Sequence, residues 1–328
     1  MMRTQLILLH DCSDALVAAI ERDGLLLCTS TAAGSVYLRK PPAIAPGTGC
    51  APLPRESVQA IDHGLVLSCE YDDITSWDSI RHELQQVAVA IQLVKPSGLF
   101  LEYWLQLDES GEPEFADTCV RDLGLLMCPE PYLQYQMHNV IEEVDVRRGL
   151  GFLSNLAKTL DRSQGSWEHP LLAIHRAVVF FCQGYTVNPN EPSQFLWAAG
   201  LDCLYASKLV KNKQGSKEIC ARIEKLLGAA TIPYDAIQLP RNQRGRKTLP
   251  LTTVAHDIFE LRNAFAHGKS IPDRNWLSAR DAELESGYAY QLREQTEILL
   301  RLSLLKILED QVLFETFSDA HKLDAYFY

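Results

Sequence analysis

The sequence predicts an α+β domain in residues 1–130, an all-α helical bundle in residues 136–312 and a C-terminal tail at 313–328. Two observations lead to this division. Short apolar or alternating runs broken by Gly, Pro and Asp fill the first part, which is typical of strands and turns. From about residue 135, apolar residues recur at spacings of three and four, which is typical of amphipathic helices. A length of 328 residues suits two domains.

The first part of the chain contains strand-like and helix-like segments. Their pattern does not predict the order of the strands in a sheet. Strands are expected at residues 5–9, 24–29, 35–39, 64–71 and 99–107. One helix is expected at residues 78–94, where Ile80, Leu84, Val87 and Ile91 have helical spacing. Residues 41–54 read as a proline-rich loop.

The second part consists of helical segments joined by turns. Helices are expected at residues 138–160, 170–185, 191–208, 216–227, 252–267 and 281–310. The first of them has a weak point at Gly149 and Gly151, because glycine is a poor helix former. Pro170 suits a helix start and Gly228 a helix end. Six such segments predict a helical bundle.

Composition and charge narrow the class of protein. Hydrophobic residues make up 47% of the chain and charged residues 22%, which excludes disordered and fibrous classes. The formal net charge of -11 comes from the first half: residues 1–165 hold 12 basic and 23 acidic side chains, and the remainder holds 19 of each. Between Lys208 and Lys247, ten basic residues stand against three acidic ones. The acidic chain therefore contains a basic segment that suits an anionic partner.

The nine cysteines point to neither a metal cluster nor a disulfide framework. No pair has the two-residue gap of zinc ligands, and the number is odd. A reducing cytoplasm is the expected location. The first apolar run is too short for a secretory signal, and no stretch approaches the roughly 18 apolar residues of a membrane span. We therefore expect no cofactor, no metal and no membrane partner.

The most informative segment is DIFELRNAFAHGK, residues 257–269. Ile258, Leu261 and Phe265 recur at helical spacing and predict a face that packs inward. Gly268 follows His267 directly, so the helix should end at this histidine.

Three polar residues occupy the last two turns of this helix. Asn263 and His267 are four residues apart and therefore share a face. Arg262 lies about 140° round the axis from His267. A second copy of the helix is one way to bring the arginine and the histidine to one groove, which predicts a two-fold homodimer through the bundle.

These residue types suit metal-free RNA cleavage. Histidine can take the proton from a ribose 2′-OH because its pKa lies near neutral pH. Arginine can hold two oxygens of the phosphate as negative charge develops. Asn263 can bind a phosphate oxygen or fix the imidazole tautomer. The structural alternative is an Arg262 ion pair with Asp257, Asp202 or Glu260, and a His267 that only ends the helix.

The pattern resembles the R-x4-H signature of HEPN domains, an all-α family found as ribonucleases in toxin and antiphage defence systems. Residues 191–204, EPSQFLWAAGLDCL, look like the second-helix motif of ApeA-like HEPN domains, with Asp202 where Glu is more usual. The resemblance covers roughly residues 136–312. It implies that Arg262, Asn263 and His267 are catalytic and that Asp202 supports them.

Basic residues beside this helix are candidates for RNA binding. Four lie in RNQRGRK, residues 241–247, and one follows the helix: Arg241, Arg244, Arg246, Lys247 and Lys269. Such a loop can contact a phosphate backbone. The alternative is a loop that is only solvated.

Together these features predict a metal-independent endoribonuclease that leaves a 2′,3′-cyclic phosphate, in antiphage defence or a toxin–antitoxin setting. The N-terminal domain would sense a trigger, bind a partner such as an antitoxin, or restrain the nuclease. One alternative is a non-catalytic HEPN dimer that binds a nucleotide, RNA or a partner protein. Another is a toxin silenced by a paired nucleotidyltransferase antitoxin.

Overall fold

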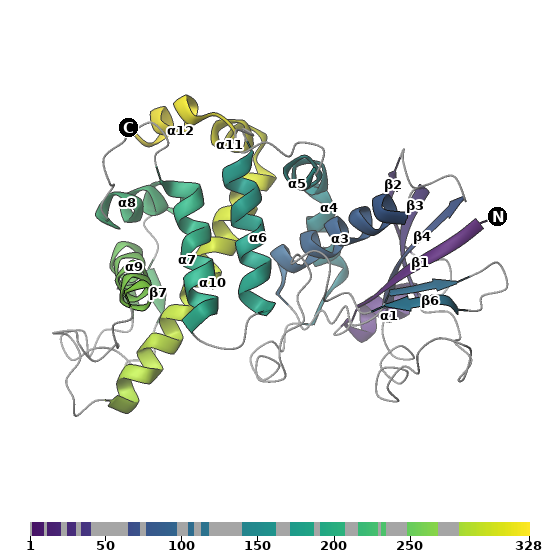
Figure 1. Cartoon of the computed structure of the whole chain (residues 1–328), viewed down its shortest axis with the longest axis horizontal. Coiled ribbons are helices and arrows are strands. Elements are labelled where there is room, and N and C mark those ends of the chain that lie inside the picture. The colour runs from purple at the N-terminus through teal and green to yellow at the C-terminus, as the bar shows by residue number, and fades with distance from the viewer. Residues whose placement is uncertain are drawn as a thin grey trace. The chain divides into compact units, whose positions relative to one another are not determined.

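The computed structural model divides the chain into two compact units, Met1–Leu160 and Asp161–Tyr328, which are described separately here (Figure 1). The structure describes residues 2–9, 12–20, 25–30, 34–40, 65–72, 77–96, 104–107, 113–117, 140–161, 171–186, 191–206, 216–228, 231–233, 248–267 and 282–328.

Unit 1 is built on a six-stranded antiparallel sheet of order β2-β3-β4-β1-β5-β6. The strands are β1 (Met2–Leu9), β2 (Leu25–Ser30), β3 (Gly34–Arg39), β4 (Leu65–Asp72), β5 (Trp104–Leu107) and β6 (Pro113–Asp117). β1 is central and pairs with β4 and β5. Four of the five expected strands are confirmed in place. The fifth, expected at residues 99–107, is confirmed at 104–107, and its first five residues lie outside the described ones. β6 is an addition that no sequence pattern indicated.

Alternation along the strands gives the sheet its apolar face. In β3, Val36 and Leu38 are fully buried, and the register places them opposite Cys69 and Leu67 of β4. Successive side chains of a strand point to opposite faces, so these four residues share one side of the sheet. That side is therefore the one on which the core of unit 1 forms.

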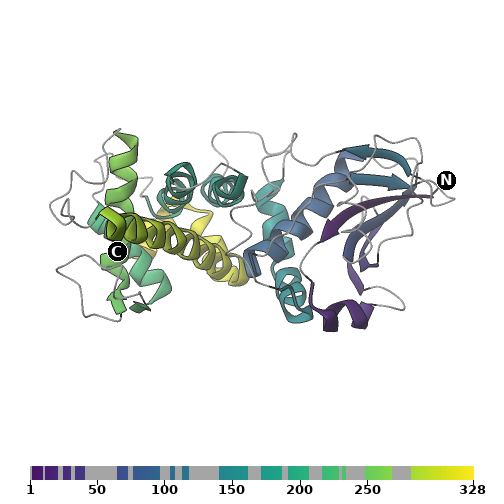
Figure 2. The same cartoon turned by 90° about the horizontal axis from the view of Figure 1, so that it is seen from below.

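Helix α3 (Trp77–Val94) packs on this core (Figures 1 and 2). It confirms the expected helix at residues 78–94, and its spaced apolar residues Ile80, Leu84, Val87 and Ile91 belong to the core cluster. A short helix that the sequence did not indicate, α1 (Asp14–Ile20), adds two further core residues, Leu16 and Ile20.

The segment expected as one helix at 138–160 is two helices and belongs to unit 1. α4 (Glu143–Gly151) ends where Phe152 leaves helical geometry, and α5 (Leu153–Leu160) follows. The break confirms the weak point at the glycines. The first compact unit therefore extends to Leu160 rather than ending near residue 130, because Val146 of α4 packs into the sheet–α3 core.

Gly149 explains how α4 comes so close to α3. A Cβ at this position would lie 3.1 Å from the backbone carbon of Ala90, whereas a Cβ at Gly151 would meet nothing within 4 Å. An ion pair between Lys95 and Asp145, at 3.2 Å, lies beside this contact. Periodicity alone predicted a helix here but not the core against which it packs.

Unit 2 is mainly helical, which confirms the expectation for this half of the chain. Its first helices are α6 (Leu172–Thr186), α7 (Glu191–Tyr205), α8 (Ser216–Leu227) and α9 (Leu251–Ala266). The long α10 (Ala282–Glu309) runs across α6 and α7 and also contacts α8 and α9 (Figures 1 and 2). A two-stranded ladder of β7 (Thr231–Pro233) and β8 (Thr248–Pro250) precedes α9.

The apolar part of the 191–204 motif packs α7 against α6. The Trp197 indole Nε1 donates to the carbonyl oxygen of Phe181 at 3.0 Å, and its ring meets Tyr185 edge-on. A Cβ at Gly184 would lie 2.1 Å from the same indole nitrogen, so only glycine allows this approach. Trp197 therefore has a packing role in this fold.

Residues 313–328, expected as a tail, are folded within unit 2 as the end of α11 (Gln311–Phe317) and all of α12 (Ala320–Phe327). Both helices begin at an aspartate whose carboxylate accepts two backbone N–H groups, Asp310 and Asp319. These bonds lower the pKa of Asp319. Phe317 and Leu323 are fully buried, so these short helices are held by tertiary packing that local periodicity does not show.

The glycine contact gives the first testable prediction. Gly149→Ala should be less stable than Gly151→Ala by about 1–3 kcal/mol, because only the first inserts a methyl group against a packed backbone. The two substitutions gain similar helix propensity, so each serves as the control for the other. Equal unfolding free energies in a denaturant titration would contradict the close approach of α4 to α3.

Candidate functional site

Helix α9 carries the R-x4-H residues and ends where the sequence predicted. His267 is its C-terminal cap, with φ −101° and ψ 10°, and the His267 N–H donates to the Asn263 carbonyl oxygen at 3.1 Å. Ile258 and Leu261 are buried and Phe265 is half-buried, as the spacing predicted. The apolar face of the helix is thus committed to the core, and its polar residues are left at the surface.

Arg262 points toward α7 and pairs with Asp202. Its Nη2 lies 2.5 Å from Asp202 Oδ2, and the two side chains are 25% and 28% exposed. The guanidinium also lies 5.5 Å from the centre of the Phe259 ring. Of the three acidic residues considered from the sequence, the structure therefore assigns Asp202, which is also the acidic residue of the α7 motif.

This ion pair is incomplete in its hydrogen bonding. Asp202 Oδ1 and Arg262 Nε are both buried and have no hydrogen-bond partner within the described part of the chain. A side-on pair would use both atoms, whereas this one joins through a single contact. Burial raises the pKa of the Asp202 carboxyl, and the Arg262 charge lowers it by less. Charging Asp202 inside the fold therefore costs stability despite the nearby arginine.

Asn263 and His267 lie on a different stripe of α9. Asn263 is half-buried and His267 is exposed. The same stripe carries His256, whose Nδ1 lies 3.4 Å from Asp257 Oδ1. Because Arg262 lies about 140° round the axis from His267, one copy of α9 directs these two side chains to different places.

The candidate RNA-binding residues Arg241, Arg244, Arg246, Lys247 and Lys269 lie outside the described residues. The structure does define the residues that flank segment 234–247. The strands β7 and β8 pair on either side of it, with Pro233 opposite Thr248. β8 leads directly into α9 at Leu251. From Leu251, the helix rises about 24 Å to His267.

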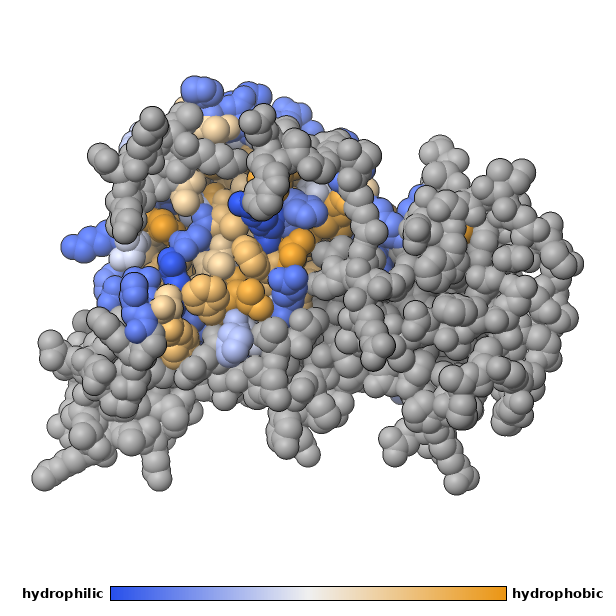
Figure 3. Space-filling view, in the orientation of Figure 1, coloured by the Kyte–Doolittle hydropathy of each residue, from blue (hydrophilic) through white to orange (hydrophobic). Residues whose placement is uncertain are grey.

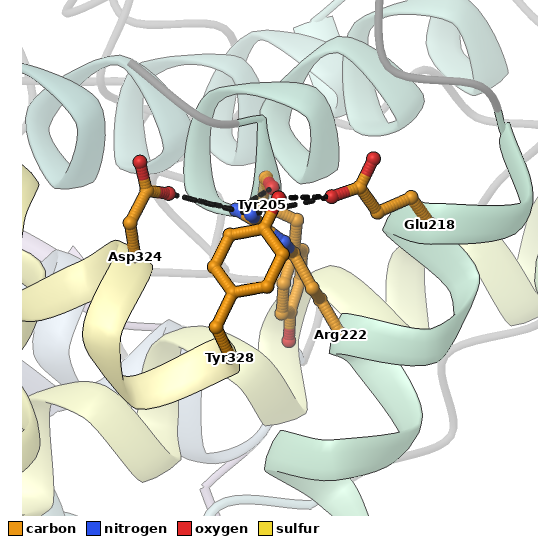
Figure 4. Close-up of polar contacts among 5 residues, drawn as sticks. All are labelled: Tyr205, Glu218, Arg222, Asp324 and Tyr328. Carbon is orange, nitrogen blue, oxygen red and sulfur yellow. Dashed lines mark hydrogen bonds and ion pairs between the residues drawn. The ribbon is translucent and has the colours of Figure 1, made fainter. Parts of the chain in front are cut away.

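A second polar cluster was not found from the sequence (Figure 4). Arg222 of α8 is only 3% exposed and contacts the end of α7 and the last helix, α12. The Glu218–Arg222 spacing was visible as a helical i, i+4 pair. Its other carboxylate, Asp324, lies in the segment that was expected to be a tail.

Three other features of the described residues concern cavities, metal ligands and membrane spans. An open hollow of about 520 Å³ in unit 1 lies where α1 and α4 begin, between Ser13 and Arg147. Within the described ranges, no three His, Cys, Asp or Glu side chains are placed to hold a metal ion. In the same ranges, none of the helices is long and apolar enough to cross a membrane.

The fold and site define a two-unit chain with a helical second unit. In that unit an arginine–aspartate pair joins α7 to α9, and a histidine on a different stripe of α9 ends the helix. No family model matches the sequence, and no curated protein or solved structure is significantly similar to it.

The raised pKa of Asp202 gives a prediction with a definite sign. The folded state holds the Asp202 proton more tightly than the unfolded chain does, so ionisation of this residue lowers stability as the pH rises above its ordinary pKa, near 4. Asp202→Asn removes this contribution. The stability of the variant relative to the parent should therefore increase from pH 4 upward in parallel denaturant titrations.

The opposite trend, with the parent gaining on the variant as the pH rises, would show that the attraction of Arg262 outweighs burial. Asp310→Asn is a useful comparison, because Asp310 is an exposed helix-capping carboxylate outside this site.

Proposed function

We propose that unit 2 is a metal-independent endoribonuclease of the HEPN type. His267 takes the proton from the ribose 2′-OH, Arg262 holds the phosphate oxygens, and Asn263 orients the phosphate or the imidazole. The 2′-oxygen forms a bond to phosphorus, the bond to the 5′-oxygen breaks, and this oxygen leaves with a proton. The products are a 2′,3′-cyclic phosphate and a 5′-hydroxyl.

The observation that carries the proposal is the Asp202–Arg262 ion pair. Arg262 is held at a partly exposed edge by a carboxylate from another helix, and burial raises the pKa of that carboxylate. Ionisable groups held at such a cost cluster at functional sites. The pair joins the two segments, in α7 and α9, whose sequences carry the HEPN resemblance.

A homodimer is part of the proposal. Because Arg262 and His267 point to different sides of α9, a second copy is needed to complete one groove. Phe195 supports a partner surface near the pair: it is 38% exposed and lies seven residues before Asp202, hence on the same face of α7. Figure 3 shows apolar side chains gathered on the face of unit 2 that Figure 1 presents, beside hydrophilic ones.

A second candidate function follows from the same geometry. In one chain Arg262 is already engaged by Asp202 and is directed away from His267. A non-catalytic dimer that binds a nucleotide, RNA or a partner protein would use this arrangement without cleavage. In either case the N-terminal unit is proposed to sense a trigger or to bind a partner such as an antitoxin.

The central test of the nuclease is cleavage of total RNA in EDTA. Loss of a general acid/base costs about 10²–10⁴ in rate, so His267→Ala should cut that much more slowly. Arg262→Lys should also be strongly impaired, because an ammonium cannot copy the two-pronged contact of a guanidinium.

His256→Ala is the matched control, since this histidine lies three turns earlier on the same stripe of α9 and should not matter. Cleavage that survives His267→Ala at full rate, or that requires added divalent metal, rejects the mechanism. Binding without cleavage selects the second candidate.

Neutralising Arg241, Arg244, Arg246 and Lys247 together should weaken RNA binding and flatten its salt dependence, because each phosphate contact releases counterions. The free energy of unfolding should barely change. Lys217→Gln with Lys322→Gln, two exposed cations on other helices, is the control. A salt slope equal to that of the parent would leave the loop as a solvated segment.

The oligomeric state can be tested by sedimentation. The chain should sediment as a dimer at micromolar concentration, and Phe195→Asp should yield monomers, because burying a carboxylate at an apolar contact is costly. Leu302→Asp on α10 is the control, since Leu302 is 40% exposed and thus as accessible as Phe195. A monomer that still cuts RNA would rule out the composite groove.

A further inference from the structure

Arg222 of α8 is a buried cation with no place in the site described above. Its Nη1 donates to the carbonyl oxygen of Tyr205, the last residue of α7, at 3.1 Å. Both of its terminal nitrogens lie 3.3 Å from Asp324 Oδ1 of α12. The guanidinium, carried by the middle of α8, thus joins the end of α7 to the middle of α12.

Most of the surroundings of Arg222 come from α12. Figure 4 shows the carboxylates of Asp324 and Glu218 approaching the guanidinium from opposite sides. The Phe327 and Tyr328 rings lie 5.1 and 5.3 Å from it, and the Tyr328 hydroxyl donates to Glu218 Oε1 at 2.7 Å. Without α12 and Tyr328, Arg222 would lose one carboxylate and both aromatic contacts. Among the described residues, only Glu218 and the Tyr205 carbonyl would then remain to hold the guanidinium.

The contact at Tyr205 fixes the last turn of α7. The final carbonyl groups of a helix lack donors within the helix, and a cation placed there satisfies them and favours the helix dipole. In the same turn, the Ala206 N–H donates to the Asp202 carbonyl oxygen at 2.9 Å. This turn also carries the Asp202 side chain that pairs with Arg262.

We infer that Arg222 is a positioning residue for the Asp202–Arg262 pair, and that docking of α12 sets its position. When α12 is docked, Arg222 holds the Tyr205 carbonyl, the last turn of α7 stays helical and Asp202 faces Arg262. When α12 is displaced, Arg222 is freed, this turn frays and Asp202 leaves Arg262. The C-terminal helix thereby controls the site through the last turn of α7. The effect on RNA cleavage rests on the proposed function, but the effect on the turn does not.

The direct test is hydrogen exchange at the Ala206 amide in the full-length chain, followed by NMR and normalised to Ala198 in the middle of the same helix. Arg222→Met removes the cation, and Asp324→Asn is a milder variant that removes only the charge opposing it. Both should speed exchange at Ala206 by about tenfold or more relative to Ala198, because they allow local opening of the turn. Arg222→Lys should give an intermediate rate.

Lys306→Met is the matched control. Lys306 Nζ donates to the carbonyl oxygen of Leu226, the last-but-one residue of α8, so it makes the same kind of contact at a different helix end. Its loss should leave the normalised exchange at Ala206 unchanged. Unchanged exchange in both Arg222→Met and Asp324→Asn, or equal acceleration in Lys306→Met, would overturn the inference.

Activity separates this inference from the proposed function. If the chain cuts RNA, Asp324→Asn should lower kcat with little change in KM, because Arg262 is proposed to hold the charge that develops on the phosphate in the transition state. A chain that cuts no RNA, yet shows the exchange pattern above, supports the inference and rejects the nuclease.

Discussion

The Asp202–Arg262 ion pair is the interaction on which the geometry of the candidate site depends. Arg262 lies outside the apolar face of α9, and its guanidinium contacts the Asp202 carboxylate of α7. The pair therefore links the two helices at their polar edges. Desolvation of Asp202 exceeds the attraction of the arginine, which makes the contact a poor source of stability. An interaction that costs stability and still fixes a guanidinium at a partly exposed edge is best explained by a use for that guanidinium.

The last turn of α7 makes both of the contacts on which the candidate site depends. Within three residues it supplies a carboxylate to Arg262 and a carbonyl oxygen to Arg222. On the inner side of the same helix, the Tyr205 hydroxyl bonds to Ser303 of α10 at 2.7 Å, and Trp197 bonds to α6. The inner face of α7 is thus held by α6 and α10, whereas its polar edge contacts Arg262 of α9 and Arg222 of α8.

Local signals predicted most of the longer elements and several of their ends, since caps and periodicity act over one or two turns. The end of α9 at His267 is an example. The same signals could not tell that Val146 packs against the sheet of unit 1 rather than in the bundle, because an apolar stripe does not specify its partner. They also missed α12, whose Asp324 meets Arg222 from 102 residues away in sequence. For the site, residue spacing left three acidic candidates for Arg262. The resemblance pointed to Asp202, and the fold pairs Arg262 with this residue.

The most direct measurement replaces both members of the pair by apolar residues of similar size, Asp202→Leu with Arg262→Met. If the pair is retained for function, this double variant should keep a free energy of unfolding within about 1 kcal/mol of the parent, or exceed it. It should also lose all cleavage of RNA in EDTA. A double variant that is several kcal/mol less stable and still cuts RNA at the parent rate would show that the pair is structural.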